Sequence, residues 1–437
     1  MPPAQPTFKE AVRFWLLLGF ISFGGPAGQI AIMREFLVDK KRWISDSRFL
    51  HALNYCMLLP GPEAQQLATY TGWLLHGVRG GLAAGILFVL PSMFILLGLS
   101  AIYVVYGTLP WVAAMFAGLK PAVIAIVILA MIKIAGKALL SPLHYAVSAA
   151  AFVCIFFLHI PFPLIIIGAI TVALLLRRYA PVKGANKTTG KKGSPNERDY
   201  FLNAESAISG EEFSIKRLLK QLAVGLGLWI APLVVVLGFV VDPTFWIQLQ
   251  GFFTKAALVT FGGAYAVLPY VAQVSVEKLQ WLSAGQMIDG LALGETTPGP
   301  LIMVLAFVGF MAGYNTSGGS LLIGAMGLTA TTYFTFLPCF LFIFIGAPLI
   351  EGTRSNAAIG NALSFVSAAV VGVVLNLALY LGRSVLFETT VDLGSLNVPV
   401  AIWMLMSVAA LKWFKVNMIV WIGISAAVGL LYFLVAG

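Results

Sequence analysis

The sequence predicts an all-α polytopic membrane protein, built as two inverted-topology repeats whose helices are broken or re-entrant. Three observations favour this fold class. Sixty per cent of the 437 residues are hydrophobic and only 10% are charged, whereas soluble domains are about half apolar and about a quarter charged. Apolar runs of about 20 residues, long enough to cross about 30 Å of hydrocarbon, recur along the chain. Motifs of the first half also return in the second half at a fixed distance.

The apolar runs indicate how often the chain crosses the bilayer. We expect about ten full spans plus re-entrant hairpins; if some hairpins cross fully, the count changes but the inversion need not. Lys9 and Arg13 precede the first run as in a signal peptide, but no small-residue cleavage site follows, so we expect this segment to be retained. The later runs lie at about 82–105, 111–137, 143–160, 161–178, 218–241, 321–350, 361–382, 396–413 and 416–436.

The charge distribution argues against a nucleic-acid partner. The net charge is +10, but ten Lys and Arg residues lie in or beside the polar segment 177–220. Its centre, KGANKTTGKKGSPNERD, is rich in Gly, Ser and Lys, which is typical of a disordered linker. Membrane proteins concentrate Lys and Arg in their cytoplasmic loops, so we expect a cytoplasmic linker beside the bilayer and no bound nucleic acid.

Cysteine and histidine patterns give no sign of a metal or catalytic centre. The three cysteines are far apart, and the four histidines do not cluster at metal-ligand spacing. The sequence contains no CxxC, HExxH, GxSxG or phosphate-loop motif. We therefore expect no metal, no cofactor and no enzyme activity.

The chain contains an internal duplication. FVLPSMF around Pro91 matches FTFLPCF around Pro338 at a shift of 247 residues. Three earlier motifs share a shift of 238 residues: Phe23-Gly24-Gly25 with Phe261-Gly262-Gly263, Pro60-Gly61-Pro62 with Pro298-Gly299-Pro300, and Trp43-Ile44-Ser45 with Trp281-Leu282-Ser283. Repeats at one offset indicate two copies of one structural unit.

The duplication divides the chain into five regions. The two repeats are expected to be copies of one structural unit, and the single connecting helix is expected to invert the second repeat. The regions are an N-terminal cytoplasmic tail (1–10), the first repeat (11–178), the cytoplasmic linker (179–217), a connecting transmembrane helix (218–245) and the second repeat (246–437).

Charges in matched loops indicate the inversion independently. The stretch 34–48 holds five Lys or Arg residues, whereas its counterpart 272–286 holds only Lys278. The loop with Arg79 matches the uncharged YNTSGG, while the uncharged YGTLP matches GTRSN, which contains Arg354. Since cationic loops prefer the cytoplasmic side, the two repeats are expected to lie upside down relative to each other.

The FGG and PGP motifs interrupt apolar segments. Irregular backbone persists in hydrocarbon only where it lines a cavity or is buried in protein, because an unpaired N–H there costs several kcal/mol. Inverted repeats with interrupted helices are typical of secondary transporters, which bind substrate near the midplane between the repeats. A helix that restarts after a break presents free N–H groups and a positive dipole end, so we expect an anion. The alternative is that these residues only allow close helix packing or kinks.

The predicted substrate-binding residues are those of the motifs and their polar neighbours. The glycines are expected to let an ion approach the backbone, and the prolines to start the next helix. Amides and hydroxyls can donate to oxyanion oxygens without burying a charge. The set is Gly24, Gly25, Pro26, Gln29, Pro60, Gly61, Pro62, Gln65, Lys120, Gly262, Gly263, Tyr265, Thr296, Thr297, Pro298, Gly299 and Pro300.

Four charged residues are further candidates. Lys120 either offsets the charge of an anionic substrate or extends its ammonium to the membrane interface, and Arg79 is a second cation for guiding charge. Glu63 and Glu295 are candidates for proton coupling or ion pairing, because intramembrane carboxylates are costly without a function. Glu63 could instead cap the start of its own helix.

These motifs resemble those of the chromate transporter family in its long, two-domain form. The resemblance covers nearly the whole chain outside the linker. It implies a multi-pass transporter of the bacterial inner membrane that moves chromate, usually by export that confers resistance, with sulfate as the structural look-alike. It also implies half-length members that exist as pairs of opposite orientation; a homodimer is left open here. The stretches concerned are FISFGGPAGQIAIMREFL, LLPGPEAQQLATYTGWLLHGVRGGL, VTFGGAYAVLPYV and GETTPGPLIMVLAFVGF.

The membrane potential favours export of such a substrate. Moving one charge through 100 mV is worth about 2.3 kcal/mol, so a dianion leaving an inside-negative cell gains about 4.6 kcal/mol per 100 mV. Export therefore needs no coupled ion, and proton coupling through Glu63 or Glu295 is the alternative. An anion channel or a lipid-handling protein on the same scaffold is the alternative function.

Overall fold

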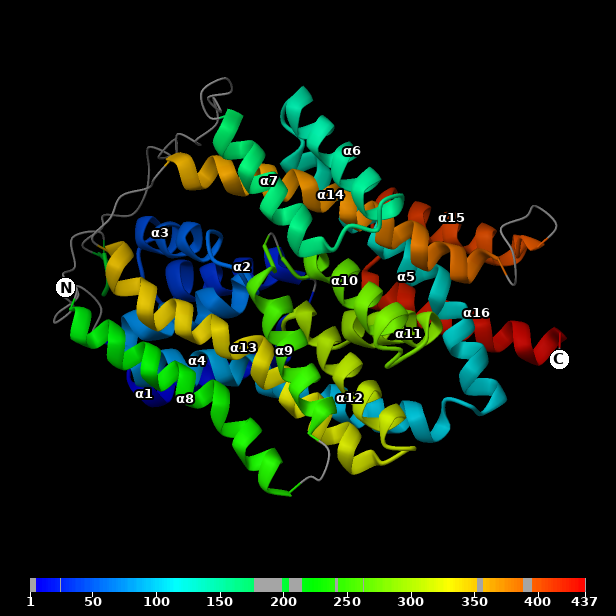
Figure 1. Cartoon of the computed structure of the whole chain (residues 1–437), viewed down its shortest axis with the longest axis horizontal. Helices are drawn as coiled ribbons and strands as arrows, with labels where there is room; N and C mark the ends of the chain where they lie inside the picture. Colours follow the sequence, from blue (N-terminus) through cyan, green and yellow to red (C-terminus); the bar gives the residue numbers. More distant parts are fainter. Residues whose placement is uncertain are drawn as a thin grey trace.

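The described parts of the protein are helical, which confirms the predicted all-α class. A computed structural model describes residues 5–23, 25–176, 199–203, 214–239, 243–261, 263–351, 357–387 and 395–436. Within these ranges the extended pairing is limited to two isolated bridges, between Ile44 and Leu202 and between Phe387 and Leu396. The helices pack side by side into one body (Figure 1).

The helices follow the chain in two comparable series joined by α8 (Ile215–Phe239). The first series is α1 (Phe8–Ile21), α2 (Gly25–Arg34), the π-helical η1 (Glu35–Lys40), α3 (Asp46–Cys56), α4 (Glu63–Tyr106), α5 (Pro110–Ala138), α6 (Pro142–Phe156) and α7 (Phe162–Leu176). The second is α9 (Thr244–Leu258), α10 (Ala264–Ala272), the π-helical η3 (Gln273–Lys278), α11 (Ala284–Thr296), the 3₁₀ turn η4 (Leu301–Met303), α12 (Val304–Thr316), α13 (Leu321–Glu351), α14 (Ala357–Leu386), α15 (Val398–Lys412) and α16 (Met418–Ala436).

Equivalent side chains start equivalent helices in the two repeats. The Ser45 hydroxyl accepts the N–H of Arg48 at the start of α3. The hydroxyl of its counterpart Ser283 accepts a hydrogen bond from the Gln286 N–H at the start of α11. The Gln286 side chain in turn accepts a hydrogen bond from the Ser283 N–H. Such caps satisfy N–H groups that the first helical turn leaves unpaired. The repeated WxS motif is therefore a helix start in both halves.

The first FGG motif lies at the tip of a hairpin. The Phe14 and Phe36 rings stack with centroids 3.8 Å apart, and Lys41 Nζ lies 2.7 Å from Glu10 Oε1. The chain that enters along α1 therefore returns along α2 and η1 to the side from which it came. Gly24 lies outside the described residues.

The first PGP motif lies at the tip of a second hairpin, formed by α3 and the start of α4. Helix α4 bends at His76 and Gly77, where Gly77 has φ +61°. We call residues 63–75 its short arm and residues 78–106 its long arm. The arms pack closely, since a Cβ on Gly72 would lie 2.6 Å from that of Ala84. The predicted span 82–105 is this long arm.

Helix α13 runs antiparallel to the long arm of α4, as inverted repeats require. Gly81 packs against the Phe344 ring, and Gly85 packs against the Phe340 ring. Residue numbers therefore rise along α4 as they fall along the neighbouring α13. The hairpins of the second repeat accordingly enter from the side opposite to those of the first.

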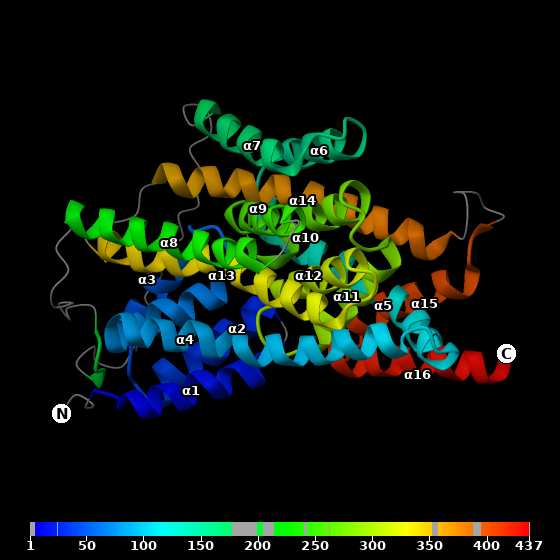
Figure 2. The ribbon, with the colours of Figure 1, turned by 60° about the horizontal axis from the view of Figure 1, so that its bottom comes forward.

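The last two helices of each repeat pack on the other repeat. Helices α6 and α7 lie along α14, as both views show (Figures 1 and 2), and the backbone of Gly372 in α14 approaches that of Ser148 in α6. Helices α15 and α16 pack in the equivalent way on α5. The repeats are therefore intertwined, and each completes the core of the other.

Several apolar helices are shorter than the sequence predicts. Six described helices are long and apolar enough to cross a membrane, namely α4, α5, α8, α13, α14 and α16. The predicted spans 143–160, 161–178 and 396–413 correspond to α6, α7 and α15, which have 15 residues each. At about 1.5 Å per residue, such a helix covers about 22 Å, less than the hydrocarbon thickness.

Part of the predicted linker is attached to the first repeat. The N–H of Leu202 donates to the Trp43 carbonyl at 3.0 Å, and the N–H of Ser45 donates to the Leu202 carbonyl at 2.8 Å. Tyr200 is buried. We call the side that holds residues 42–45 and 199–203 the linker side, and the opposite side the far side. Residues 179–198 and 204–213 of the predicted disordered linker lie outside the described residues.

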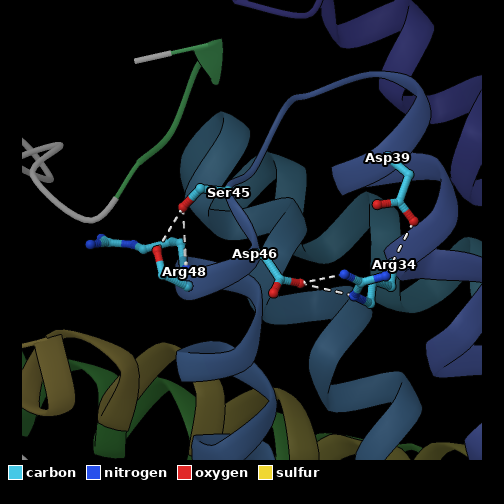
Figure 3. A network of polar contacts seen from close by, with 6 residues as sticks. Arg34, Asp39, Ser45, Asp46 and Arg48 are labelled. Carbon is cyan, nitrogen blue, oxygen red and sulfur yellow. Dashed lines mark hydrogen bonds and ion pairs between the residues drawn. The ribbon is translucent and has the colours of Figure 1, made fainter. Parts of the chain in front are cut away.

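A polar network holds the same loop in place (Figure 3). Arg34 lies 3.2 Å from Asp39 and 2.8 Å from Asp46, so its guanidinium joins the end of α2 to the start of α3. All three side chains are 41–49% exposed, so these pairs contribute little to stability. Their effect is to position the loop that receives residues 199–203.

Replacing Gly429 with leucine is expected to destabilise the protein. Gly429 in α16 lies so close to α5 that a Cβ would come within 2.8 Å of the Gly118 backbone nitrogen. Overpacking of this kind costs about 1–3 kcal/mol. Thermal unfolding in detergent should show a lower midpoint. Gly423→Leu is the matched control, since a Cβ at Gly423 meets nothing within 4 Å; an equal loss in both variants would contradict the close α5–α16 contact.

Candidate functional site

The four helix breaks meet between the repeats. The N–H of Gly61 donates to the Thr260 carbonyl at 2.7 Å, and the N–H of Gly299 donates to the Ser22 carbonyl at 2.8 Å. Both donors and both acceptors are 238 residues apart, so the two bonds are equivalent. Each PGP tip is thus bonded to the FGG break of the other repeat. We call the contact at Ser22 and Gly299 the first junction, and the contact at Gly61 and Thr260 the second.

Each PGP tip rests on the long helix of the other repeat. A Cβ on Gly299 would lie 2.7 Å from that of Ser92, and a Cβ on Gly61 would lie 2.7 Å from the Cys339 Sγ. Ser92 follows Pro91 and Cys339 follows Pro338, which are matched positions. The backbone at both tips has positive φ, +120° at Gly61 and +101° at Gly299. Only glycine meets both requirements without strain.

The first junction contains two hydroxyls without protein partners. Ser22 and Ser92 are buried, and their Oγ atoms have no hydrogen-bond partner among the described residues. Buried polar atoms in folded proteins are almost always hydrogen-bonded, because leaving them unpaired costs free energy. Two unpaired hydroxyls at one break are therefore suited to a polar ligand.

Gln29 holds the first junction together. Its Nε2 donates to the Gly299 carbonyl at 2.6 Å, across 270 residues of sequence, and its side chain is 1% exposed. Gln29 therefore lies at the break, but its bond in this conformation goes to the PGP tip, and its donation to a substrate stays a prediction. Since Ser22 and Ser92 are buried beside it, the polar side chains of the first junction are shielded from solvent.

The matched hydroxyl and thiol of the second junction, unlike Ser22 and Ser92, are hydrogen-bonded within the protein. The Thr260 hydroxyl donates to the Ala256 carbonyl, and the Cys339 thiol donates to the Thr335 carbonyl. Gln66 Nε2 donates to the Pro60 carbonyl, which leaves its Oε1 buried and without a partner among the described residues. An unpaired carbonyl oxygen repels an anion. The two junctions are therefore equivalent in backbone but unequal as anion sites.

Three predicted donors turn inward to their own helices. Gln65 Nε2 donates to the Thr69 hydroxyl at 3.1 Å. The hydroxyls of Thr296 and Thr297 donate to the Leu293 carbonyl in α11. In this conformation each of these side chains donates a hydrogen bond within its own helix or the helix that precedes it. Bonds of this type back to the preceding turn are common for hydroxyls inside helices.

The described glycines of the FGG breaks have positive φ and open surroundings. Gly25 has φ +76° and Gly263 has φ +98°, and a Cβ on either would meet nothing within 4 Å. The backbone is therefore open beside both helix starts. Pro26 lies in the first turn of α2, as predicted, whereas Pro62 precedes α4 as its N-cap. Gly24 and Gly262 lie outside the described residues.

The charged candidates lie in four different places. Lys120 Nζ is 3.8 Å from Asp289 Oδ1. Glu295 is buried and accepts a hydrogen bond of 2.5 Å from the Tyr265 hydroxyl. These two predicted site residues are therefore bonded to each other. Glu63 is the first residue of α4, where a helix start favours negative charge. Arg79 is exposed beside the bend of α4, at the end of the hairpin remote from its PGP tip, so the structure does not bring it to the junctions.

The sequence patterns do not single out Ser22, Ser92 or Asp289. Ser22 stands directly before the first FGG motif, and Ser92 follows the proline of the repeated FVLPSMF motif, so both lay within motifs already recognised. Asp289 is an isolated acid between apolar residues of α11, which is the usual signal of an intramembrane site.

An apolar cavity of about 250 Å³ lies beside the second junction. It lies between α7 and α14, next to Leu58, which precedes the first PGP motif, and Phe261, the first residue of the second FGG motif. Its lining contains no polar side chain, so it does not suit an anion. The lining residues are Leu58, Ile170, Leu174, Phe261, Ala362, Leu363 and Val366.

Comparison with known proteins finds similarity to one family over both repeats. The family model described as chromate transporter matches residues 9–174 and 247–430. A chromate transport protein of Pseudomonas aeruginosa is 30% identical over 85% of this chain and 80% of its own length. One from Cupriavidus metallidurans is 28% identical over 94% and 89%, and a probable chromate transport protein of Synechococcus elongatus is 27% identical over 91% of both chains. No solved structure matches.

Proposed function

The chain belongs to the chromate transporter family, a family of membrane transporters and not of enzymes, and from this we propose that it carries chromate or a related tetrahedral oxyanion across the bacterial inner membrane. The observation that supports the substrate class is the first junction, where the unpaired hydroxyls of Ser22 and Ser92 lie beside Gly299 between the repeats. Hydroxyl donors bind an oxyanion without the cost of burying a cation.

The proposed binding mode combines hydroxyls with a helix start. Helix α2 begins at Gly25, three residues after Ser22, with open space beside the Gly25 backbone. The first N–H groups of a helix and its positive dipole end attract anions. A tetrahedral dianion offers acceptor oxygens in several directions, so it can accept from Ser22, Ser92 and backbone N–H groups together. Sulfate has the same shape and charge and should compete.

The proposed mechanism is alternating access between the repeats. Hairpins that enter from opposite sides meet at two equivalent backbone hydrogen bonds. Separating one junction would expose the site to one side while the other junction stays closed. Inverted repeats around a central site are the usual structural basis of this mechanism.

We propose export as the direction. The linker side holds the loop with five Lys or Arg residues between 34 and 48, and cationic loops favour the cytoplasm. The attachment of residues 199–203 to this loop is consistent with a cytoplasmic linker. A dianion that leaves an inside-negative cell gains about 4.6 kcal/mol per 100 mV, twice the value for one charge.

Flux into proteoliposomes tests the proposal. Labelled chromate should enter with saturation kinetics when the vesicle interior is held positive, because the dianion moves toward positive potential. Unlabelled sulfate should inhibit competitively, and a monovalent anion without tetrahedral oxygens, such as chloride, should not. Absence of chromate and sulfate flux at every imposed potential and pH gradient would refute the substrate class. Unsaturable flux with single-channel currents would refute the transporter mechanism in favour of a channel.

A further inference from the structure

A second polar cluster connects the two repeats away from the junctions. It consists of Lys120 in α5, Tyr103 near the end of the long arm of α4, and Asp289 in α11. The Tyr103 hydroxyl donates to Asp289 Oδ2 at 2.9 Å, and Lys120 Nζ lies 3.8 Å from Asp289 Oδ1. We call these three residues the far-side cluster, because the hairpin of α11 enters the membrane from the far side.

The ion pair in this cluster is loosely made. A separation of 3.8 Å is too long for a direct hydrogen bond. Asp289 Oδ1 is buried without a hydrogen-bond partner among the described residues, while Oδ2 is held by Tyr103. The Lys120 side chain is 31% exposed and that of Asp289 only 7%. The Lys120 side chain is therefore partly accessible, while the Asp289 carboxylate is buried and held by Tyr103.

The cluster lies between the far-side surface and the helix breaks. Tyr103 is three residues before the end of α4, and Asp289 is in the second turn of α11, whose other end carries the second PGP motif. Lys120 approaches the same region, since a Cβ on Gly285 would lie 3.5 Å from its Nζ. Helix α11 therefore runs from this ammonium to the PGP tip at the first junction.

We propose that the far-side cluster is a second oxyanion subsite. In it the Asp289 carboxylate pairs with the Lys120 ammonium until a substrate oxyanion displaces the carboxylate. The inference rests on the proposed function. A carboxylate resembles the edge of a tetrahedral oxyanion in charge and in its paired oxygens, so Asp289 competes with substrate for the same ammonium. Tyr103 keeps the displaced carboxylate in place. Among the described residues, Lys120 and Tyr103 are the ionisable groups of neighbouring helices that interact with the Asp289 carboxylate by charge or by hydrogen bond.

Neutral substitutions of Asp289 and Lys120 distinguish a substrate subsite from a structural ion pair. Asp289→Asn keeps the size of the side chain and removes the competitor, so the apparent KM for chromate presented from the far side should fall several-fold. Lys120→Gln should raise it at least tenfold. In the double variant Lys120→Gln/Asp289→Asn the apparent KM should equal that of Lys120→Gln, because the ammonium with which Asp289 competes is absent. The comparison of right-side-out with inverted membrane vesicles assigns the effect to one face.

The control is Asp46→Asn, which makes the same change in the exposed pair with Arg34 and should leave KM unchanged. Yield and thermal unfolding of each variant report on the folded protein separately. A structural ion pair predicts that both single variants lose stability, that the double variant recovers stability, and that KM stays constant in all of them. That result would overturn the inference. If wild-type protein moves no oxyanion at all, the proposed function falls. If wild-type flux is saturable but Asp289→Asn leaves KM unchanged on both faces, only the subsite falls.

Discussion

Gly299→Ala is expected to lower chromate flux, measured as kcat/KM, on the order of 100-fold or more, a loss of about 2.7 kcal/mol at 1.36 kcal/mol per factor of ten. Alanine at φ +101° is strained by about 1–2 kcal/mol. Its Cβ would also lie 2.7 Å from that of Ser92, so the PGP tip must move. That movement breaks the bonds that the Gly299 N–H donates to Ser22 and that Gln29 donates to the Gly299 carbonyl.

The matched control for Gly299 is Gly318→Ala. Gly318 has φ +70°, but a Cβ there meets nothing within 4 Å, and the residue lies in the turn between α12 and α13. This variant carries the backbone strain without the clash, so it should lose a little stability and keep its flux. Normal flux in Gly299→Ala, or an equal loss in both variants, would show that the first junction is not required for transport.

The double variant Ser22→Ala/Ser92→Ala is expected to lose transport while it keeps or gains stability. A hydrogen bond to a charged group is worth about 1.5–3 kcal/mol, so two of them correspond to at least a 100-fold loss in kcat/KM for chromate. In the structure both hydroxyls are buried and unpaired among the described residues. Their removal therefore eliminates a cost to folding. Opposite signs for transport and stability distinguish a binding role from a structural one.

Ser384→Ala provides the comparison for this pair. The Ser384 hydroxyl is exposed and donates to the Leu381 carbonyl of its own helix. Its removal should change neither chromate flux nor the unfolding midpoint in detergent by a measurable amount. The proposed site would be wrong if the double variant transported chromate with wild-type KM, or if it unfolded at a much lower temperature than Ser384→Ala.

The repeated motifs predict the arrangement of the breaks well. Shifts of 238 and 247 residues align Ser22 with Thr260 and Ser92 with Cys339, and these matched residues occupy equivalent places around the PGP tips. Motif spacing succeeds here because duplicated segments that fold alike make equivalent contacts. The charge pattern of matched loops likewise agrees with the antiparallel packing of α13 on α4.

The direction of individual donors could not be predicted in the same way. Whether Thr297 donates to a ligand or to the Leu293 carbonyl depends on its rotamer, which the surrounding helices select. The bond from Gln29 to Gly299 and the pairing of Lys120 with Asp289 join residues far apart in sequence. Hydropathy also counts apolar residues without showing where a helix ends, which is why α6 and α7 are shorter than the runs that contain them.

The exchange of terminal helices between the repeats bears on biogenesis. When the first repeat leaves the ribosome, α6 and α7 have been synthesised, but the surface of α14 on which they pack has not. The nascent half must therefore wait in the bilayer as an incomplete intermediate, with lipid or an insertion factor covering that face. Native packing of α6 and α7 becomes available only after α14 is inserted, and the face of α5 that α15 and α16 cover stays open until those two helices follow. Packing of the first repeat is thus completed only after helices of the second repeat have been inserted.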